Sequence, residues 1–326
     1  MPTALVTGAT GFIGSNLALK LLEKGYNVRV FYRKNSDLSN ISKLNVEHYC
    51  GDILDEKSLI SAMKGSDIVF HTAAIVAFWK GRKNEQKRTN VEGSRNIVKV
   101  CLKTGIKKLI HTSSVAALGF TTNGQLINEN TPYNWGTSNS YRYTKYLAEL
   151  EILKGVEKGL NAVIVNPSIV LGGGDRHAHG GRLIIEVKSG RLRFYSSGAT
   201  NVVSVYDVVN GHILAAEKGR MGERYILSDW NCTHKELLNL IAEVVNGKKH
   251  FIKIPKYIVT IAGRLFDIVG TLTNSEPSLS SQLAKSIVQC NWYTYAKAER
   301  ELGYKPTSIK DAIVEAYEWY KKNNII

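Results

Sequence analysis

The chain contains few cysteines, and their spacing excludes both a paired-cysteine zinc site and a compact disulfide framework. Its 326 residues include four cysteines that lie far apart in the chain, namely Cys50, Cys101, Cys232 and Cys290. Cysteines that hold zinc usually come in close pairs, and disulfide-stapled proteins are short and rich in cysteine. We therefore expect reduced, structural cysteines and no metal site.

Proline and export signals are also scarce or absent, which argues against further classes of protein. Six prolines, 44% hydrophobic residues and 22% charged residues are ordinary for a globular chain and unusual for a disordered or fibrous one. The first residues lead directly into a strand pattern, without the charged and apolar segments of a signal peptide. We expect a cytoplasmic protein.

One apolar segment, residues 258–272, raises the question of a membrane. It is too short to span a bilayer as a helix, and Arg264 and Asp267 interrupt it. The sequence therefore predicts a buried or surface helix and no transmembrane segment. Peripheral contact with a membrane surface, or with a partner protein, is the alternative, because the segment lies in the basic C-terminal half.

Acidic residues are too few to balance the basic ones. The chain has 43 lysines and arginines against 28 aspartates and glutamates, which gives a net charge of +15 at pH 7. Such a surface attracts anions of any kind. The basic residues are scattered in ones and twos, and no zinc-finger or RNA-binding signature accompanies them, so nucleic acid is not an expected partner.

Short apolar strands alternate with helical patterns through the first half of the chain. Strands are expected at residues 4–7, 28–32, 46–49, 68–71, 108–112 and 162–165. Helices are expected at residues 13–24, 57–63, 92–103 and 140–158, and each is followed within two residues by a glycine that can end it. This alternation predicts an α/β protein with a doubly wound parallel sheet, the Rossmann fold.

The alternation weakens after Pro167, where glycine-rich loops begin. A strand at 202–205, a helix at 208–218 and a strand at 223–228 then resume the earlier pattern. We predict a dinucleotide-binding domain made of residues 1–170 and about 201–228. Residues of about 171–200 and 229–326 would form a smaller, discontinuous C-terminal lobe that binds the substrate.

The first strand leads into a glycine-rich turn that opens a helix, which is the arrangement that binds a dinucleotide. Gly8 permits a tight turn, Gly11 lets the backbone approach the pyrophosphate, and Gly14 lets the helix pack closely on the sheet. Phe12 and Ile13 lie between them, at the helix N-terminus whose N–H groups attract phosphate. All five residues are predicted to bind the cofactor.

The end of the second predicted strand favours NADP(H) over NAD(H). An acidic residue there usually binds the ribose hydroxyls of NAD, but this strand ends in Arg33 and Lys34. Arg33 can pair with a 2′-phosphate, which a carboxylate would repel. NAD(H) remains the alternative, in which Asp37 reaches the ribose instead.

Two later strands end in residues that suit the rest of the dinucleotide. Asp52 and Ile53 follow the third strand, where they could contact the adenine, although Asp52 could instead cap the helix that begins near Asp55. Ala73 and Ala74 follow the fourth strand and are small enough to lie against the middle of the cofactor.

Tyr141 and Lys145 are four residues apart on a predicted helix, so both project from one face. An adjacent cation favours the phenolate and would lower the pKa of the tyrosine, which makes it a better acid–base catalyst. Lys145 would also bind the nicotinamide ribose. Ser114 follows the fifth strand and is our candidate to hydrogen-bond the substrate oxygen, with Ser113 as its rival.

The order and spacing of these motifs resemble the extended short-chain dehydrogenase/reductase superfamily, also called the NAD-dependent epimerase/dehydratase family. Residues 28–33, 89–93, 113–119 and 222–227 look most like its dihydroflavonol 4-reductase-like branch, and 3β-hydroxysteroid dehydrogenases and hopanoid-associated sugar epimerases are similar. The family alignment of Gly119 favours Ser114 over Ser113. Pro167, Ser168 and Ile169 resemble the segment that lines the nicotinamide in these enzymes.

One departure from the superfamily concerns the substrate. Sugar-nucleotide enzymes usually carry a Tyr-Gly-Pro segment after the sixth strand, and residues 163–172 of this chain lack it. The resemblance therefore implies an oxidoreductase that interconverts a carbonyl and an alcohol on a small, largely apolar molecule. A nucleotide-sugar epimerase or dehydratase is the alternative, followed by an NADP(H)-sensing binding module. A homodimer is common in the resembled family.

Overall fold

The computed structural model describes residues 1–121, 124–178 and 180–326. Seven parallel strands form its central sheet in the order β10-β6-β5-β4-β1-β2-β3. They are β1 (Thr3–Thr7), β2 (Asn27–Tyr32), β3 (Glu47–Cys50), β4 (Ile68–His71), β5 (Lys108–Thr112), β6 (Ala162–Pro167) and β10 (Arg224–Leu227). This order reverses direction beside β1, as in dinucleotide-binding folds, and it confirms the predicted Rossmann fold.

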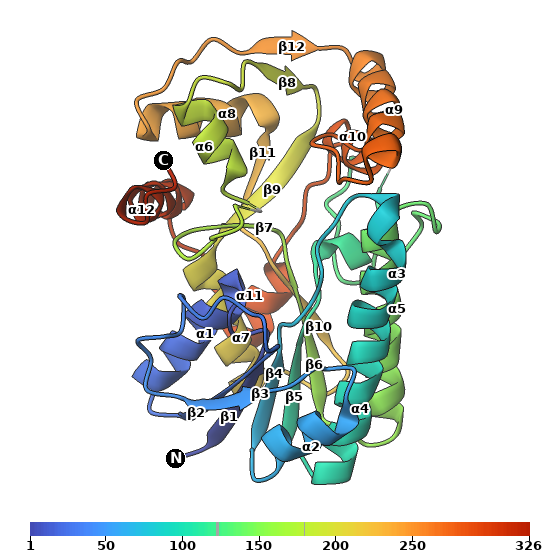
Figure 1. Cartoon of the computed structure of the whole chain (residues 1–326), viewed down its shortest axis with the longest axis vertical. Helices are drawn as coiled ribbons and strands as arrows, with labels where there is room; N and C mark the ends of the chain where they lie inside the picture. The colour runs from blue at the N-terminus through green and yellow to red at the C-terminus, as the bar shows by residue number, and fades with distance from the viewer. Residues whose placement is uncertain (122–123, 179) are drawn as a thin grey trace.

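Helices cover both faces of the sheet (Figure 1). One face carries α1 (Phe12–Glu23), α7 (Val205–Lys218) and α11 (Ala296–Leu302), and the other carries α2 (Glu56–Met63), α4 (Gly93–Thr104) and α5 (Ser140–Glu157). Successive strand residues point to opposite faces, so Ala4 and Val6 lie in one core and Leu5 lies in the other. This explains why the strands are apolar at nearly every position.

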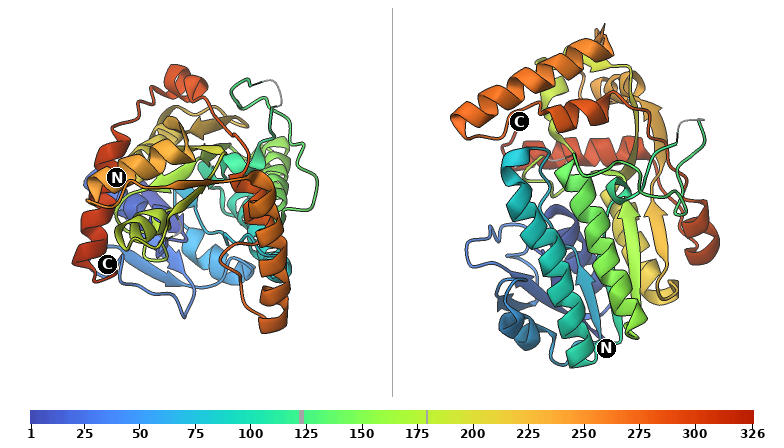
Figure 2. Two further views of the ribbon diagram at one scale, coloured as in Figure 1. Left: turned by 90° about the horizontal axis from the view of Figure 1, so that it is seen from above. Right: turned by 90° about the vertical axis from the view of Figure 1, so that its right-hand side faces the viewer.

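The four helices predicted for the first half of the chain agree with the structure, except that more helical structure precedes the third of them. The four glycines expected to end helices all have positive φ, between 69° and 91°. Helical structure before α4 begins earlier than expected, because η1 (Lys80–Arg82), α3 (Lys83–Gln86) and one π-helical turn, η2 (Lys87–Glu92), precede it. The continuous helical run from residue 83 to 104 is visible in Figure 2.

A second lobe lies beyond the carboxyl ends of the strands (Figure 1). Its sheets are β11-β9-β7, with β7 (Ile169–Leu171), β9 (Ala199–Ser204) and β11 (Trp230–Thr233), and the pair β8 (Phe194–Ser196) and β12 (Ile252–Ile254). Its helices are α6 (Arg182–Lys188), α8 (His234–Val244), α9 (Lys256–Thr273), α10 (Ser281–Ile287) and α12 (Ile309–Lys322). Within the three described ranges, no helix is long and apolar enough to cross a membrane.

The strand expected at 202–205 lies in the small sheet, where β9 pairs with β7 and β11 and not with the central sheet. The helix α7 that follows it returns to the central sheet, and β10 pairs with β6. The chain therefore crosses between the two sheets several times. The division into residues 1–170 with about 201–228, and 171–200 with 229–326, stays a prediction.

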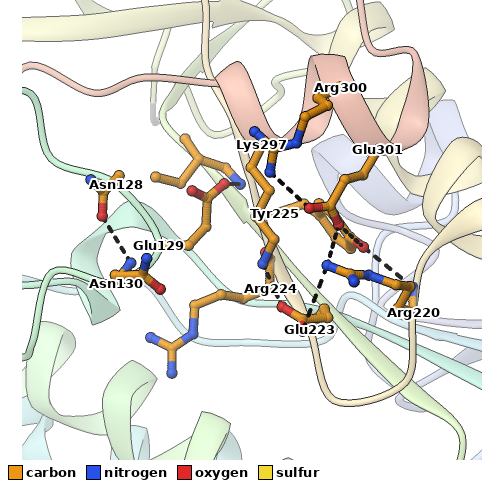
Figure 3. A network of polar contacts seen from close by, with 11 residues as sticks. Asn128, Glu129, Asn130, Arg220, Glu223, Arg224, Tyr225, Lys297, Arg300 and Glu301 are labelled. Atoms are coloured by element: carbon orange, nitrogen blue, oxygen red, sulfur yellow. Dashed lines mark hydrogen bonds and ion pairs between the residues drawn. The ribbon is translucent and has the colours of Figure 1, made fainter.

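Side chains hold the edge strand β10 in place (Figure 3). The Lys297 ammonium on α11 lies 2.5 Å from a carboxylate oxygen of Glu223, and Glu301 accepts a 2.7 Å bond from Arg220. On the other side, Glu129 accepts a 2.9 Å bond from a main-chain N–H of β10. An exposed sheet edge can pair with another chain, and these contacts cover it with charged groups.

Candidate active site

A large pocket opens at the carboxyl ends of the central strands, where ligands bind in open α/β folds. Its volume is about 1780 Å³. Pockets for one drug-sized ligand are usually about 300–1,000 Å³, so this pocket has room for a dinucleotide and a second molecule. It runs from the end of β2 and β3, across the glycine-rich turn, to α10 of the second lobe.

The glycine-rich turn has the geometry that the sequence predicts for a dinucleotide. Gly8 has a φ of 68°, and a side chain there would lie 2.7 Å from the backbone of Ala73. A side chain at Gly14 would lie 2.3 Å from the carbonyl oxygen of Gly8. Only glycine fits these two positions, and the resulting closely packed backbone turn suits the pyrophosphate of a nicotinamide dinucleotide.

The N-terminus of α1 faces this turn without a side-chain cap among the described residues. Gly11 occupies the cap position and donates a 3.0 Å hydrogen bond to the Gly8 carbonyl. A loop of the second lobe lies against the same turn, because Asn16 donates to the Gly173 carbonyl and Asn40 to the Gly174 carbonyl, each at 3.0 Å. These asparagines had no recognisable signal in the sequence.

Charged residues surround the end of the pocket beside β2. Arg33 and Lys34 both line it, as predicted for Arg33. Asp37, the alternative ribose ligand, is engaged by Arg176 at 3.0 Å and accepts hydrogen bonds from Ser39, and both contacts hold its pKa below the usual value. Because its carboxylate already has these partners, Asp37 is less available to a ribose than the sequence suggested.

The residues after β3 and β4 line the same half of the pocket. Asp52 accepts a 2.9 Å hydrogen bond from the N–H of Leu54, whereas Asp55 caps α2 by accepting from Lys57 and Ser58. The alternative that Asp52 caps this helix is therefore wrong. Ile53, Ala73 and Ala74 also line the pocket.

Tyr141 lies in the first turn of α5, which Asn139 caps. Its side chain lines the pocket, and the ring packs edge-on against Phe78 with centroids 5.2 Å apart. Burial raises the pKa of Tyr141 above its ordinary value of 10, and a hydrogen bond from Ser114 acts in the opposite direction. The positive charge of Arg142 also lowers this pKa, whereas Lys145, the cation expected to do so, is not among its causes. The desolvation of the phenol is the largest effect, so the pKa is raised overall.

Lys145 lies one turn further along α5 but does not line the pocket. It is buried, and its ammonium group donates a 2.8 Å hydrogen bond to the main-chain carbonyl of Thr112. Burial lowers the pKa of Lys145 to about 8, while the nearby carboxylate of Glu149 acts in the opposite direction. The lysine is thus held at the end of β5, as a cation that loses its proton more readily than usual.

The two serine candidates differ in their surroundings. Ser114 accepts a 3.2 Å hydrogen bond from the N–H of Ala116, where it caps the short helix η3 (Val115–Ala117), and it also contacts Tyr141. Ser113 is buried, and its hydroxyl has no hydrogen-bond partner among the described residues. Both line the pocket. The contact with Tyr141 favours Ser114.

Three buried histidines lie in the layer behind Lys145. His71 contacts the hydroxyls of Thr7 and Ser94, and its ring is 5.3 Å from that of His111. His212 contacts the Thr112 hydroxyl at 2.7 Å. Burial lowers the pKa of His71 to about 3 and of His212 to about 4, and that of His111 falls well below its ordinary value. The histidines are therefore neutral at pH 7.

The second-lobe end of the pocket combines apolar side chains with one buried cation. Phe78, Leu283 and Ile287 line this end, together with Arg142. The Arg142 guanidinium stacks on Trp135 at 3.7 Å and donates to the Ser286 hydroxyl at 3.4 Å. Sequence reasoning missed this arginine, because its burial depends on residues that are distant in the chain.

The predicted site residues are brought together almost completely. All of them except Lys145 line the one pocket: Gly8, Gly11, Phe12, Ile13, Gly14, Arg33, Asp52, Ile53, Ala73, Ala74, Ser114, Tyr141, Pro167, Ser168 and Ile169. Their roles remain predictions. Residues that the sequence did not indicate are Arg142 and the apolar side chains contributed by α10.

The fold and this glycine-lined pocket define a nicotinamide-dependent oxidoreductase of the extended short-chain dehydrogenase/reductase superfamily. The chain belongs to the 3-beta hydroxysteroid dehydrogenase/isomerase family, whose model matches residues 5–229. The resemblance stated from the motifs is thereby confirmed.

Individual relatives match over nearly their full length. "Sterol demethylase protein B" of Methylococcus capsulatus is 32% identical, over 99% of this chain and 100% of its own. A "Putative dihydroflavonol 4-reductase" of Synechocystis sp. is 33% identical, over 98% of this chain and 95% of its own. The crystal structure of gox2253 superposes with a TM-score of 0.88 at 35% identity, over 99% of both chains.

More distant structures share the fold alone. The UDP-glucose 4-epimerase of Thermotoga maritima superposes with a TM-score of 0.81 at 23% identity, over 99% of both chains. The same architecture therefore also occurs in an epimerase, and the reaction of this chain has to be argued from its site.

Proposed function

We propose that this protein is an NADP(H)-dependent oxidoreductase that interconverts a carbonyl and an alcohol on a small, largely apolar molecule. The observation that carries the proposal is the position of Tyr141 and Ser114 in one pocket with the glycine-rich turn. A phenol and a hydroxyl beside the nicotinamide end can bind one substrate oxygen from two sides.

The chain's own residues would handle the proton and the developing charge. In reduction, Tyr141 donates its proton to the carbonyl oxygen, and Ser114 hydrogen-bonds the same oxygen and holds it in place. The raised pKa of Tyr141 keeps the phenol protonated before the reaction, which suits an acid. Lys145, whose ammonium group is held by the Thr112 carbonyl, would stabilise the phenolate once the proton has left. When bound, the cofactor supplies or accepts the hydride at the carbon.

The preference for NADP(H) rests on the charges beside β2. Arg33 and Lys34 line this end of the pocket. The carboxylate that could serve the ribose hydroxyls, Asp37, is paired with Arg176. A 2′-phosphate would therefore meet two cations here, and a charge-assisted bond to Arg33 would select it over a free hydroxyl.

An apolar substrate fits the other end of the pocket. Phe78, Leu283 and Ile287 belong to its lining there. A ligand with an apolar surface would be stabilised by burying that surface against them. The relatives' names point the same way, since they refer to a sterol demethylase protein and a dihydroflavonol reductase. Tyr141 sits between this region and the glycine-rich turn.

The test is a panel of aldehydes, ketones, flavonoids and sterols, with the absorbance of NADPH or NADH followed in parallel. We expect one mole of NADPH to disappear per mole of product, and a lower KM for NADPH than for NADH. Turnover of a nucleotide sugar without net change in absorbance would establish the epimerase alternative instead. Binding of NADPH without any turnover would favour the sensing module. A cytoplasmic location and a homodimer remain predictions of the sequence.

A further inference from the structure

Helix α9 exposes an apolar face to solvent. Eight large apolar side chains of this one helix are between 43% and 81% exposed, and they are Tyr257, Ile258, Ile261, Leu265, Phe266, Ile268, Val269 and Leu272. Soluble proteins seldom expose so many contiguous apolar groups unless the surface binds something. Figure 1 shows α9 at the edge of the molecule, with α10 on its inner side.

The helix is amphipathic in the inverted sense, with its apolar side pointing away from the protein. Its buried residues are small, namely Val259, Gly263 and Gly270, and a side chain at Gly263 would lie 2.6 Å from Ala284 of α10. Each of these buried residues is followed two positions later by an exposed apolar one, namely Ile261, Leu265 and Leu272. Two residues correspond to a rotation of about 200°, so they lie on the opposite side of the helix.

Basic residues flank this apolar face. The segment from residue 248 to 285 contains six lysines and arginines, against the two carboxylates Asp267 and Glu276. Lys256 is exposed at the start of α9 and Lys253 in the preceding strand β12, and Arg264 is exposed on the helix itself. Glu276 is partly neutralised, since it lies 3.9 Å from Arg82 and accepts from the N–H of Phe78.

We propose that α9 docks this protein onto the surface of a lipid bilayer that contains anionic headgroups. The apolar face would enter the boundary between headgroups and acyl chains, and the flanking cations would contact the lipid phosphates. Charge complementarity selects this occupant over a second copy of the chain. A symmetric dimer through α9 would bring Lys253, Lys256 and Arg264 of both copies together and repel.

The position of α9 would also bring the pocket close to the membrane. Helix α9 packs on α10, and α10 contributes Leu283, Ser286 and Ile287 to the pocket lining. An apolar compound dissolved in the bilayer would thus be one helix away from the site. The docking proposal itself does not depend on the reaction, because lipid binding can be measured without any substrate.

The experiment measures co-sedimentation of the full-length protein with phosphatidylcholine vesicles, with and without phosphatidylglycerol. We expect binding to the vesicles that contain phosphatidylglycerol, weakened by added salt. The double variant Ile261→Glu with Leu265→Glu should reduce the partition coefficient about tenfold or more, since both side chains lose their place in the lipid. The matched control is Leu19→Glu with Val314→Glu, two exposed apolar residues of α1 and α12, and it should bind as the unaltered protein does.

Circular dichroism and the melting temperature show whether each variant folds. Equal binding of the α9 variant and the control would overturn the proposal, and so would the absence of binding to either vesicle. Light scattering measures whether the protein in solution is a monomer or a dimer. A dimer that the α9 substitutions convert into monomers would show that a second copy covers this face, and would overturn the lipid assignment.

A separate observation concerns Arg142, which is a buried cation without an acidic partner. It is 8% exposed, and within the described part of the chain no carboxylate forms an ion pair with it. One of its terminal guanidinium nitrogens, Nη1, has no hydrogen-bond partner there either. Burial lowers the pKa of Arg142, and only tyrosines oppose this effect. Buried charges in proteins are usually paired, so this one lacks a counter-ion.

We infer that an acidic group of the substrate, such as a carboxylate near the reacting carbonyl or alcohol, binds to Arg142. The residue follows Tyr141 directly and lines the same pocket, at the end away from Arg33. Its contacts with Trp135 and Ser286 fix the guanidinium plane and leave Nη1 for a ligand. The inference rests on the proposed function, because it refines the substrate of that reaction.

The experiment compares a long-chain 3-hydroxy acid with its methyl ester, using NADP⁺ as the oxidant. The hydroxyl carbon loses hydride to NADP⁺, the hydroxyl proton leaves, and a ketone and NADPH form. We expect kcat/KM for the acid to exceed that for the ester about tenfold or more, and we expect Arg142→Met to bring this ratio of acid to ester close to one.

Binding of the acid and of the ester, followed through Trp135 fluorescence, separates the role of Arg142 from the proposed reaction. Tighter binding of the acid without oxidation supports the role of Arg142 and counts against alcohol oxidation. Equal turnover of acid and ester supports the reaction and overturns the role of Arg142. Equal binding with no turnover overturns both.

Discussion

Tyr141 is the residue on which the proposed chemistry depends most. Replacing it with phenylalanine removes only the hydroxyl, and the ring can keep its edge-on contact with Phe78. We expect Tyr141→Phe to bind NADPH normally and to lose about 10²–10⁴-fold in kcat, the usual contribution of a general acid. Steady-state kinetics and a cofactor titration measure the two effects.

The control for this experiment lies on the same helix. Tyr143 is two residues along α5, its ring is tilted against that of Tyr133 with centroids 6.3 Å apart, and it does not line the pocket. Tyr143→Phe should leave kcat within a small factor of the unaltered enzyme. If both phenylalanine variants retained full turnover, Tyr141 could not be the acid.

Arg33 should control the choice between the two nicotinamide cofactors. Arg33→Asp replaces a cation by a carboxylate that repels a 2′-phosphate and can accept bonds from ribose hydroxyls. We expect KM for NADPH to rise about 10–100-fold, and KM for NADH to fall. Arg193→Asp, an exposed arginine of the second lobe, carries the same charge change away from the pocket and should alter neither value. A uniform loss for both cofactors would refute the assignment.

Among single residues, the sequence indicated those site residues that lie close together in the chain. The glycine-rich turn and the pair Tyr141 and Lys145 each lie within one turn or one helix, so their geometry follows from residue spacing. The depth of Lys145 and the stacking of Arg142 on Trp135 do not follow from spacing. Both depend on how a distant strand or loop packs against α5.

At the scale of the elements, Glu149 connects α5 to two strands. Its carboxylate accepts a 2.6 Å bond from Asn166 at the end of β6 and lies 3.3 Å from Arg224 on β10. Asn166 also donates to the main-chain carbonyl of Ser114 at 3.0 Å. The helix that carries Tyr141 is thus fixed to the strand end that carries the serine.

Removal of the Glu149 carboxylate should destabilise the whole protein. Glu149→Leu leaves the buried Asn166 amide and the partly buried Arg224 without this partner, and we expect the unfolding free energy to fall by about 2–4 kcal/mol. Urea denaturation measures the change. Glu56→Leu, which breaks an exposed pair with Lys99, should shift the midpoint little, and equal shifts in both variants would contradict the argument.

The elements themselves were predictable where the local pattern marks them. Strand apolarity and the glycines that end helices located the central strands, including β10 at the predicted 223–228, and the helices between them. The place of β9 was not predictable in this way, because the strand pairs with β7 and β11 in the small sheet, and its apolar sequence does not distinguish these partners from the central strands. Long-range register is set by packing, and local propensity carries no information about it.

Three buried, neutral histidines should make the stability of the whole molecule sensitive to acid. His71, His111 and His212 are buried, and their pKa values in the folded protein lie below the unfolded value of about 6.5. Above that pH both states are neutral at these groups, so stability does not depend on them. Below it the unfolded chain takes up protons that the folded protein cannot, and the unfolding free energy falls as the pH falls.

Four buried or partly buried acidic groups of the described residues oppose this trend. Burial raises the pKa of Asp229 to about 6, so the folded protein binds a proton there between about pH 6 and pH 4, which favours folding. Burial also raises the pKa values of Glu129, Asp207 and Glu315, which act in the same direction. Between about pH 6 and pH 5 we expect the three histidines to outweigh these carboxyl groups, with a net loss of roughly 1–3 kcal/mol per pH unit. Urea unfolding at a series of pH values measures the slope. His71→Gln should reduce it by one histidine's share, and the exposed His250→Gln should not change it. A stability that stays constant from neutral pH to about pH 5 would show that these histidines are not held neutral by burial.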